Sequence, residues 1–216
     1  MSLDLDALCP RLAGAPLFAP LSLAIAPGTV ACVMGPSGVG KSTLIDAIAG
    51  HLAPAFTLTG SVTLNGADIL ARPAEARRVG VVFQDAVLFP HLSVGDNLAF
   101  GLSRAVKGRA ARRAAVEAAL EQAGLSGFAA RDPASLSGGQ RARAALMRSL
   151  LADPAALLLD EPFSRLDTAL RDEIRAFTFA RIRARAIPAL LVSHDPADAA
   201  AARGPTIRLI PIGDIT

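Results

Sequence analysis

Short apolar runs alternate along the chain with longer segments in which apolar residues recur at helical spacing. This alternation is typical of an α/β core in which helices flank a parallel sheet. The segment Thr57–Leu64 alternates apolar and polar residues and runs into Asn65-Gly66, a pair that favours a tight turn, so it predicts a small antiparallel sheet near the N-terminus. The apolar runs predict strands at Val30–Met34, Val79–Phe83, Leu157–Asp160, Ala189–Ser193 and Thr206–Ile210.

The middle of the chain carries mostly helical patterning, interrupted by Pro90 and several glycines. It predicts a helical subdomain inserted into the core after Gln84 and before Asp153-Pro154. We therefore expect one domain over residues 1–216, with a core of about 1–84 and 152–216 and a helical subdomain of about 85–151. Because the sequence ends at Thr216, just past the last predicted strand, we expect no further regulatory domain.

A glycine-rich segment, residues 35–42, follows the strand that ends at Met34 and precedes a helical pattern at Ser42–Ala49. It reads Gly-Pro-Ser-Gly-Val-Gly-Lys-Ser, and strand, glycine-rich turn and helix are the context that a phosphate-binding loop needs. The glycines let backbone N–H groups surround phosphates, and the helix start adds its own amides and dipole. Lys41 supplies a positive charge to the outer phosphates, and the Ser42 hydroxyl can ligate Mg²⁺. The segment predicts a nucleoside triphosphate site.

Two later segments extend this prediction. The apolar run Ala155–Leu159 ends in two acids, of which Asp160 can hold the Mg²⁺ shell and Glu161 can polarise a water molecule. The segment Leu136–Gln140 reads Leu-Ser-Gly-Gly-Gln and opens a helix predicted at 140–151. By itself, Ser-Gly-Gly is also ordinary turn or helix-cap chemistry.

Together these motifs resemble those of the ATP-binding-cassette (ABC) ATPases, and the resemblance runs along nearly the whole chain. Gln84 stands where the family has its Q-loop glutamine, and His194 matches the switch histidine. The segment Ser164–Asp167 resembles the D-loop, with Arg165 where a smaller residue is commoner. The resemblance implies a P-loop NTPase (RecA-like) core, ATP hydrolysis and Mg²⁺. The implied catalytic residues are Lys41, Gln84, Glu161 and His194, and the implied metal-site residues are Ser42, Gln84 and Asp160.

The resemblance also implies a nucleotide site that a second copy of the chain completes in a head-to-tail dimer. Ser137 and Gly139 of that copy would face the γ-phosphate, so that ATP holds the two copies together. The nucleotide-binding residues that the resemblance implies are Gly35, Pro36, Ser37, Gly38, Val39, Gly40, Lys41, Ser42, Thr43, Ser137, Gly138, Gly139, Gln140 and Asp167.

Within the family, the segments 83–85, 88–94 and 160–167 look most like the ATPase subunits of bacterial importers for small solutes. The resemblance implies a peripheral subunit at the cytoplasmic face of the inner membrane, with transmembrane permease subunits and a periplasmic solute-binding protein as partners. Two alternatives stay open: the ATPase of an exporter or lipoprotein-release system, and a soluble ABC protein of DNA repair or translation. Repair members need a long coiled-coil insertion and translation members usually carry two cassettes, and neither occurs in this sequence.

The composition limits the cellular compartments and the classes of partner that we expect for this protein. Hydrophobic residues make up 52% of the chain, but no apolar stretch approaches the roughly 18 residues that span a bilayer, and no secretion signal stands at the start. The cysteines, Cys9 and Cys32, fit a reducing compartment. The modest net charge of +3 does not argue for nucleic-acid binding, and the lack of aromatic residues among the basic ones disfavours single-stranded nucleic acid, so we expect no nucleic-acid partner.

Two local features leave open questions. A basic cluster has two interpretations, a solvated helix face or a surface for anionic lipid headgroups or acidic partners; its members are Arg104, Lys107, Arg109, Arg112 and Arg113. The region 11–16, where the family has an aromatic residue that stacks on adenine, contains none, and Phe18 stands too close to the glycine-rich loop. We therefore expect weak preference for ATP over GTP.

Overall fold

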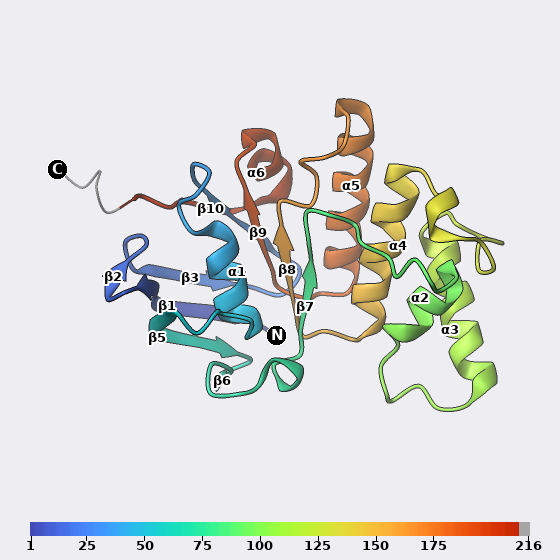
Figure 1. Ribbon diagram of the computed structural model, residues 1–216, viewed down its shortest axis with the longest axis horizontal. Coiled ribbons are helices and arrows are strands. Elements are labelled where there is room, and N and C mark those ends of the chain that lie inside the picture. The colour runs from blue at the N-terminus through green and yellow to red at the C-terminus, as the bar shows by residue number, and fades with distance from the viewer. Residues whose placement is uncertain (212–216) are drawn as a thin grey trace. The chain divides into compact units, whose positions relative to one another are not determined.

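The structure is a computed structural model and describes residues 1–211 (Figure 1). The chain divides into two compact units. Unit 1 contains Met1–Val81, Ala155–Glu161 and the described chain from Phe179 onward, and unit 2 contains Val82–Pro154 and Pro162–Thr178. The long helix α5 (Thr168–Ala184) contributes residues to both units.

The first sheet of unit 1 is antiparallel and is built around β1, which pairs with β2, β3 and β5. Along β3 buried and exposed residues alternate strictly, as expected for a sheet with one face on the core. The turn at Asn65-Gly66 has φ values of 55° and 77°, the left-handed conformation that a tight hairpin turn requires, so this prediction is confirmed. The strands are β1 (Leu3–Leu12), β2 (Ala15–Pro16), β3 (Leu21–Ile25), β5 (Phe56–Leu64) and β6 (Ala67–Asp68).

The second sheet has the order β10-β4-β9-β8-β7, in which β10, β4, β9 and β8 are parallel (Figure 1). The carboxyl ends of β4, β9 and β8 therefore lie at the same edge, where parallel α/β sheets bind their ligands. The α/β class with a parallel sheet and a small antiparallel sheet is confirmed. The strands are β4 (Val30–Met34), β7 (Val79–Val82), β8 (Ala156–Asp160), β9 (Ala189–Ser193) and β10 (Arg203–Arg208).

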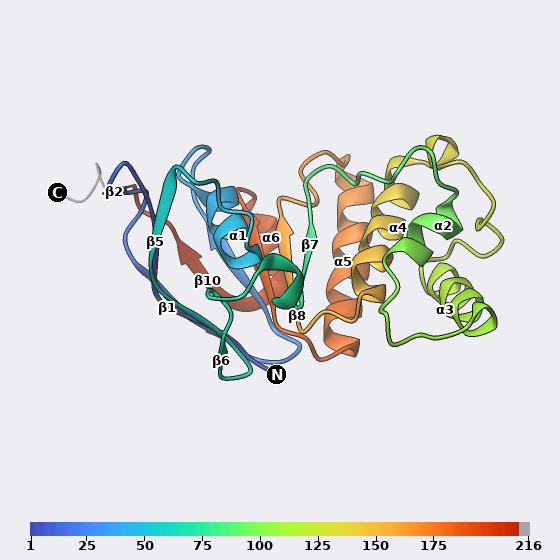
Figure 2. The ribbon, with the colours of Figure 1, turned by 60° about the horizontal axis from the view of Figure 1, so that its bottom comes forward.

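Helix α1 (Lys41–Ala49) lies between the two sheets of unit 1 and forms the centre of its core (Figure 2). Its residues Leu44, Ile45 and Ile48 are almost fully buried against apolar residues of both sheets, and each such side chain contributes about 1.5–3 kcal/mol. The buried Arg77, which follows the short 3-10 helix η1 (Ala74–Ala76), donates hydrogen bonds to the carbonyls of Ala47 and Ile48 at the end of α1. The helix is thus held firmly at its end opposite the glycine-rich loop.

The last strand begins earlier than predicted. The sequence pattern placed it at 206–210, whereas β10 spans Arg203–Arg208. A side chain at Gly204 would clash with the carbonyl of Val30, so this glycine allows the chain to approach β4 before the apolar run starts. Helix α6 (Pro196–Ala202) precedes β10 and packs against β4, β9 and β10.

Unit 2 is helical. The buried Asn97 of α2 bonds to the carbonyls of Phe89, Leu92 and Ser93 and accepts from the Phe89 amide, which fixes the loop before that helix. No helix within residues 1–211 combines the length and apolar character needed to cross a bilayer. The helices of this unit are α2 (Val94–Phe100), α3 (Arg109–Gln122), the 3-10 helix η2 (Pro133–Ser135), α4 (Gly138–Leu151) and the first part of α5.

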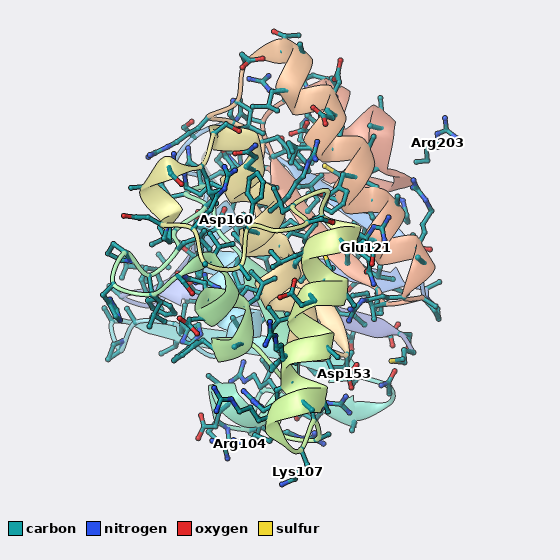
Figure 3. All side chains as sticks on the ribbon, turned by 90° about the vertical axis from the view of Figure 1, so that its right-hand side faces the viewer. Arg104, Lys107, Glu121, Asp153, Asp160 and Arg203 are labelled. Carbon is teal, nitrogen blue, oxygen red and sulfur yellow. The ribbon has the colours of Figure 1, made fainter. Side chains whose placement is uncertain are left out.

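The basic cluster lies around the start of α3. Arg104 and Lys107 lie at one end of this helix and Glu121 toward the other (Figure 3). Arg112 differs from the other members because it is half-buried and donates to the carbonyl of Ala99 at the end of α2. The remaining members are exposed, and both interpretations of the cluster stay open.

Candidate functional site

The loop between β4 and α1 has the backbone form of a phosphate-binding loop. Gly40 precedes α1 with φ of 104°, and a Cβ atom there would lie 3.1–3.3 Å from atoms of Leu17 and Phe18. The first amides of α1 have no partner within their helix and are available for anions. The loop residues Pro36, Ser37, Gly38 and Ser42 are exposed, Gly35 and Thr43 are half-buried, and Val39 is buried.

Lys41 lies across this loop. Its ammonium donates to the carbonyls of Gly35 and Pro36, both at 3.0 Å, and forms an ion pair with Glu161 at 3.2 Å. The side chain is only 5% exposed, so almost the whole of this cation is removed from bulk water. A buried cation whose oxygen partners are two carbonyls and one carboxylate is well placed to receive phosphate oxygens.

Asp160, at the end of β8, faces the start of α1. Its Oδ1 accepts a hydrogen bond from the Ser42 hydroxyl at 3.2 Å. Burial raises the pKa of the Asp160 carboxyl above its ordinary value; the Ser42 hydrogen bond opposes this rise, and the charges of Glu161 and Asp46 add to it. The positive charge of Lys41 also opposes the rise in pKa, so burial is its main cause.

Glu161 connects the loop to the end of β9. Its Oε2 lies 2.8 Å from His194 Nδ1, while its Oε1 contacts Lys41. An ionised carboxylate only accepts hydrogen bonds, so the imidazole nitrogen is the donor. Glu161 has φ of 44°, a left-handed conformation that costs a non-glycine residue about 1–2 kcal/mol, and its amide bonds to the carbonyl of Val192. A strained backbone at a carboxylate beside a buried lysine indicates a functional position.

The residues at this edge fit Mg²⁺ bound together with a nucleotide. The Ser42 hydroxyl and the Asp160 carboxylate supply hard oxygen ligands beside each other. Within residues 1–211 no group of three or more His, Cys, Asp or Glu residues forms a metal site by itself. This pattern suits Mg²⁺, which takes one or two protein oxygens and completes its shell with water and substrate phosphates.

Gln84 belongs to unit 2. It is exposed and lines a cavity of about 460 Å³ together with Gly138, Arg141 and Arg165. Arg165 forms an ion pair with Asp85, and both residues line this cavity. The structure thus brings the segment after β7 close to the start of α4 and to the segment that resembles the D-loop.

The segment Leu136–Gln140 has a clear local structural role. The Ser137 hydroxyl accepts from the Gln140 amide at 3.3 Å, and the Gln140 side chain accepts from the Ser137 amide at 3.0 Å, which makes a complete capping box for α4. The helix therefore begins two residues before its predicted start. A Cβ at Gly139 would lie 2.5 Å from Leu170, whereas Gly138 faces open space. Asp167 likewise accepts from the Leu170 amide and caps α5.

The region predicted to face the base contains no aromatic side chain that can stack. The hairpin from β1 to β2 pairs Leu12 with Ala15, and Leu12 is 43% exposed. Arg11 donates twice to the carbonyl of Gly14. Phe18 is fully buried in the core and is thereby excluded as a stacking partner.

Comparison with known proteins decides the family. A family model described as ABC transporter matches residues 18–164. The chain belongs to this family. An uncharacterized ABC transporter ATP-binding protein, YnjD of Escherichia coli K12, is 51% identical over 188 residues, which are 87% of this chain and 86% of the relative. The thiamine import ATP-binding protein ThiQ of Shigella flexneri is 43% identical over 83% of this chain and 76% of the relative.

The sulfate/thiosulfate import protein CysA of Mycobacterium tuberculosis H37Rv is 46% identical over 80% of this chain, but the match spans only 48% of that relative. A solved structure described as a dimeric post-hydrolysis state of the ATP-binding cassette MJ0796 bound to ADP and Pi shares 27% identity with a TM-score of 0.78, covering 96% of this chain and 94% of that one. The predicted P-loop NTPase core and the ABC ATPase activity are confirmed.

Sequence reasoning missed three buried polar residues that shape the site. Arg77 holds the end of α1, and Ser193 and Asp198 form a hydrogen bond of 2.6 Å directly behind His194. The signal available for the latter pair was a serine ending an otherwise apolar strand, followed by an acid in the first turn of the next helix.

Proposed function

We propose that this chain is the ATP-binding and ATP-hydrolysing subunit of a bacterial inner-membrane importer for a small solute. The proposal rests on one cluster of side chains in unit 1. Lys41 supplies a cation for phosphate, Glu161 supplies an acid that can polarise water, and His194 contacts that acid. Ser42 and Asp160 lie beside them and supply oxygen ligands for a metal ion. Relatives named as import proteins favour an importer over an exporter or a soluble ABC protein.

The chemistry follows from positioning and charge neutralisation. Lys41 and the amides of the loop and of α1 bind the outer phosphates. Phosphate oxygens then replace Glu161 as the anionic partner of Lys41, which releases the Glu161 carboxylate to polarise the attacking water. His194 holds that carboxylate through Nδ1 and contacts the γ-phosphate. Ser42 and Asp160 would hold Mg²⁺, which would supply positive charge to the phosphate oxygens. The metal role of Gln84 stays a prediction from the resemblance.

The site is completed by a second copy of the chain. The segment 137–140 lies at the start of α4, a helix of 14 residues. Gly138 faces open space, which a phosphate could approach. In the proposed head-to-tail dimer this helix start and Asp167 contact the nucleotide held by the other copy. ATP then closes the dimer, and hydrolysis opens it.

The dimer would drive transmembrane permease subunits from the cytoplasmic face of the inner membrane, and a periplasmic solute-binding protein would deliver the solute. The organisation as one nucleotide-binding domain, with a core of about 1–84 and 152–216 and a helical subdomain of about 85–151, stays a prediction.

The proposal is tested by affinity purification of a tagged chain from membranes of its native host. We expect a complex that contains a polytopic membrane protein and that hydrolyses ATP, and Glu161→Gln should trap the two copies together. Recovery of an active ATPase free of any membrane protein, with unchanged solute uptake in a deletion strain, would contradict the importer function.

A further inference from the structure

A buried hydrogen-bonded pair lies behind the turn that carries His194. The Ser193 hydroxyl donates to Asp198 Oδ2 at 2.6 Å, and it accepts from the Asp195 amide at 3.1 Å. Ser193 is 2% exposed and Asp198 is 3% exposed. One hydroxyl therefore fixes both chain neighbours of His194, Ser193 through its side chain and Asp195 through its backbone.

His194 itself has little packing to hold it. Its side chain is 54% exposed, and its ring contacts Glu161 through Nδ1 at 2.8 Å. A side chain that projects from a turn into solvent takes its position mainly from the backbone of that turn. The geometry of the contact between His194 and Glu161 thus depends on how rigidly the turn 193–195 is held.

A carboxylate is a costly side chain for this place. Burial of an ionised acid is unfavourable unless hydrogen bonds compensate the lost hydration. If this position only had to fill space, an apolar residue of similar size would be more stable there. Burial, with a further contribution from the charge of Asp198, raises the pKa of the Cys32 thiol on β4 to about 12. The short bond from Ser193 is of the charge-assisted kind, which is stronger and more directional than a neutral one.

We propose that Asp198 is a positioning residue for His194 and acts through the Ser193 hydroxyl. The carboxylate orients this hydroxyl, the hydroxyl fixes the turn 193–195, and the turn holds the imidazole against Glu161. The inference rests on the proposed role of His194 in ATP hydrolysis.

The test compares steady-state ATP hydrolysis by the purified full-length chain and its variants. Ser193→Ala and Asp198→Ala should each lower kcat by about 10-fold, the scale for outer partners that orient a functional histidine, with KM for ATP changed by less than about twofold. Asp198→Asn keeps an oxygen that accepts from Ser193 and should retain kcat within about threefold of the wild type. Thr178→Val, which removes a buried hydroxyl from α5, is the matched control and should leave kcat unchanged.

A second arm separates positioning from general destabilisation. In the His194→Ala background, Ser193→Ala should cause no further loss of kcat, because its effect passes through the missing ring. An additional 10-fold loss in that background, or a kcat that falls equally in Asp198→Asn and Asp198→Ala, would overturn the proposal. If Asp198→Ala does not fold, Ser193→Ala and Asp198→Asn decide the question alone. Wild-type hydrolysis by His194→Ala would instead refute the proposed role of His194, which is a distinct failure.

Discussion

The candidate site residues of unit 1 and those of unit 2 differ in whether a structural role in their own copy accounts for them. In unit 1, Lys41 is a buried cation that bonds to two backbone carbonyls and to the Glu161 carboxylate, and Glu161 has a left-handed backbone conformation. In unit 2, Ser137 and Asp167 cap helices, and Gly139 packs against Leu170. The residues of unit 1 thus indicate chemistry by themselves, whereas Ser137, Gly139 and Asp167 have a structural role in their own copy, and their proposed chemical role requires a second copy.

Lys41→Ala should break the unit 1 site with the largest effect. It removes the cation that binds the outer phosphates, and charge-assisted contacts of this kind contribute about 1.5–3 kcal/mol each. We expect nucleotide binding or hydrolysis to be lost in assays of the purified variant. Lys107→Ala removes an exposed lysine of unit 2 and serves as the control. Near-normal hydrolysis by Lys41→Ala would refute the assignment of the phosphate-binding loop.

Glu161→Gln should separate binding from chemistry. The amide keeps the size of the side chain but cannot polarise water, so turnover should fall roughly 10²-fold or more while ATP still binds. ATP-bound dimers should then persist in size-exclusion chromatography. Glu75→Gln, at an exposed position of the same unit, is the matched control. A monomeric Glu161→Gln variant with wild-type turnover would show that Glu161 is not the catalytic acid/base.

Asp160→Asn should raise the stability of the nucleotide-free chain and lower its rate of ATP hydrolysis. Because the pKa of Asp160 is raised in the folded state, the folded chain disfavours the ionised carboxylate. The contribution of Asp160 to the free energy of unfolding is therefore most favourable at low pH and falls as the pH rises above the ordinary pKa of 3.8. The variant should melt at a higher temperature than the wild type at pH 7 without nucleotide, by an amount that shrinks toward pH 4, and should hydrolyse ATP poorly. Equal melting temperatures at pH 7 would contradict this account of Asp160.

Base selectivity should show the smallest effect. Leu12 offers an aliphatic surface and Phe18 is buried, so a contact with the base would discriminate ATP from GTP by about 1 kcal/mol. Competition between the two nucleotides for the purified chain measures this difference. A hundredfold preference for ATP would contradict this expectation.

The sequence predicted the strands of the parallel sheet well because several of them are continuous apolar runs, as in β4 and β9, but it did not predict β1 or β3 of the antiparallel sheet. It placed Asp160 and His194 at strand ends and Lys41 in the loop that follows another strand, and strands that share a sheet bring such ends together. It did not predict the ion pair of Lys41 with Glu161 or the hydrogen bond of Ser193 with Asp198, because these depend on side-chain packing between elements distant in sequence. The start of β10 was missed because it depends on a close approach at Gly204, which hydrophobic patterning does not record.

Mixing Ser137→Arg chains with Lys41→Ala chains tests most directly the claim that unit 1 of one copy acts with unit 2 of another. Ser137→Arg alone should bind ATP with near-normal affinity but fail to dimerise and to hydrolyse it. In a mixed twofold pair, one composite site carries both defects and the other carries neither. We predict that ATP hydrolysis reappears on mixing two inactive proteins. Loss of ATP binding by Ser137→Arg alone, or demonstrated mixed dimers without hydrolysis, would contradict the account.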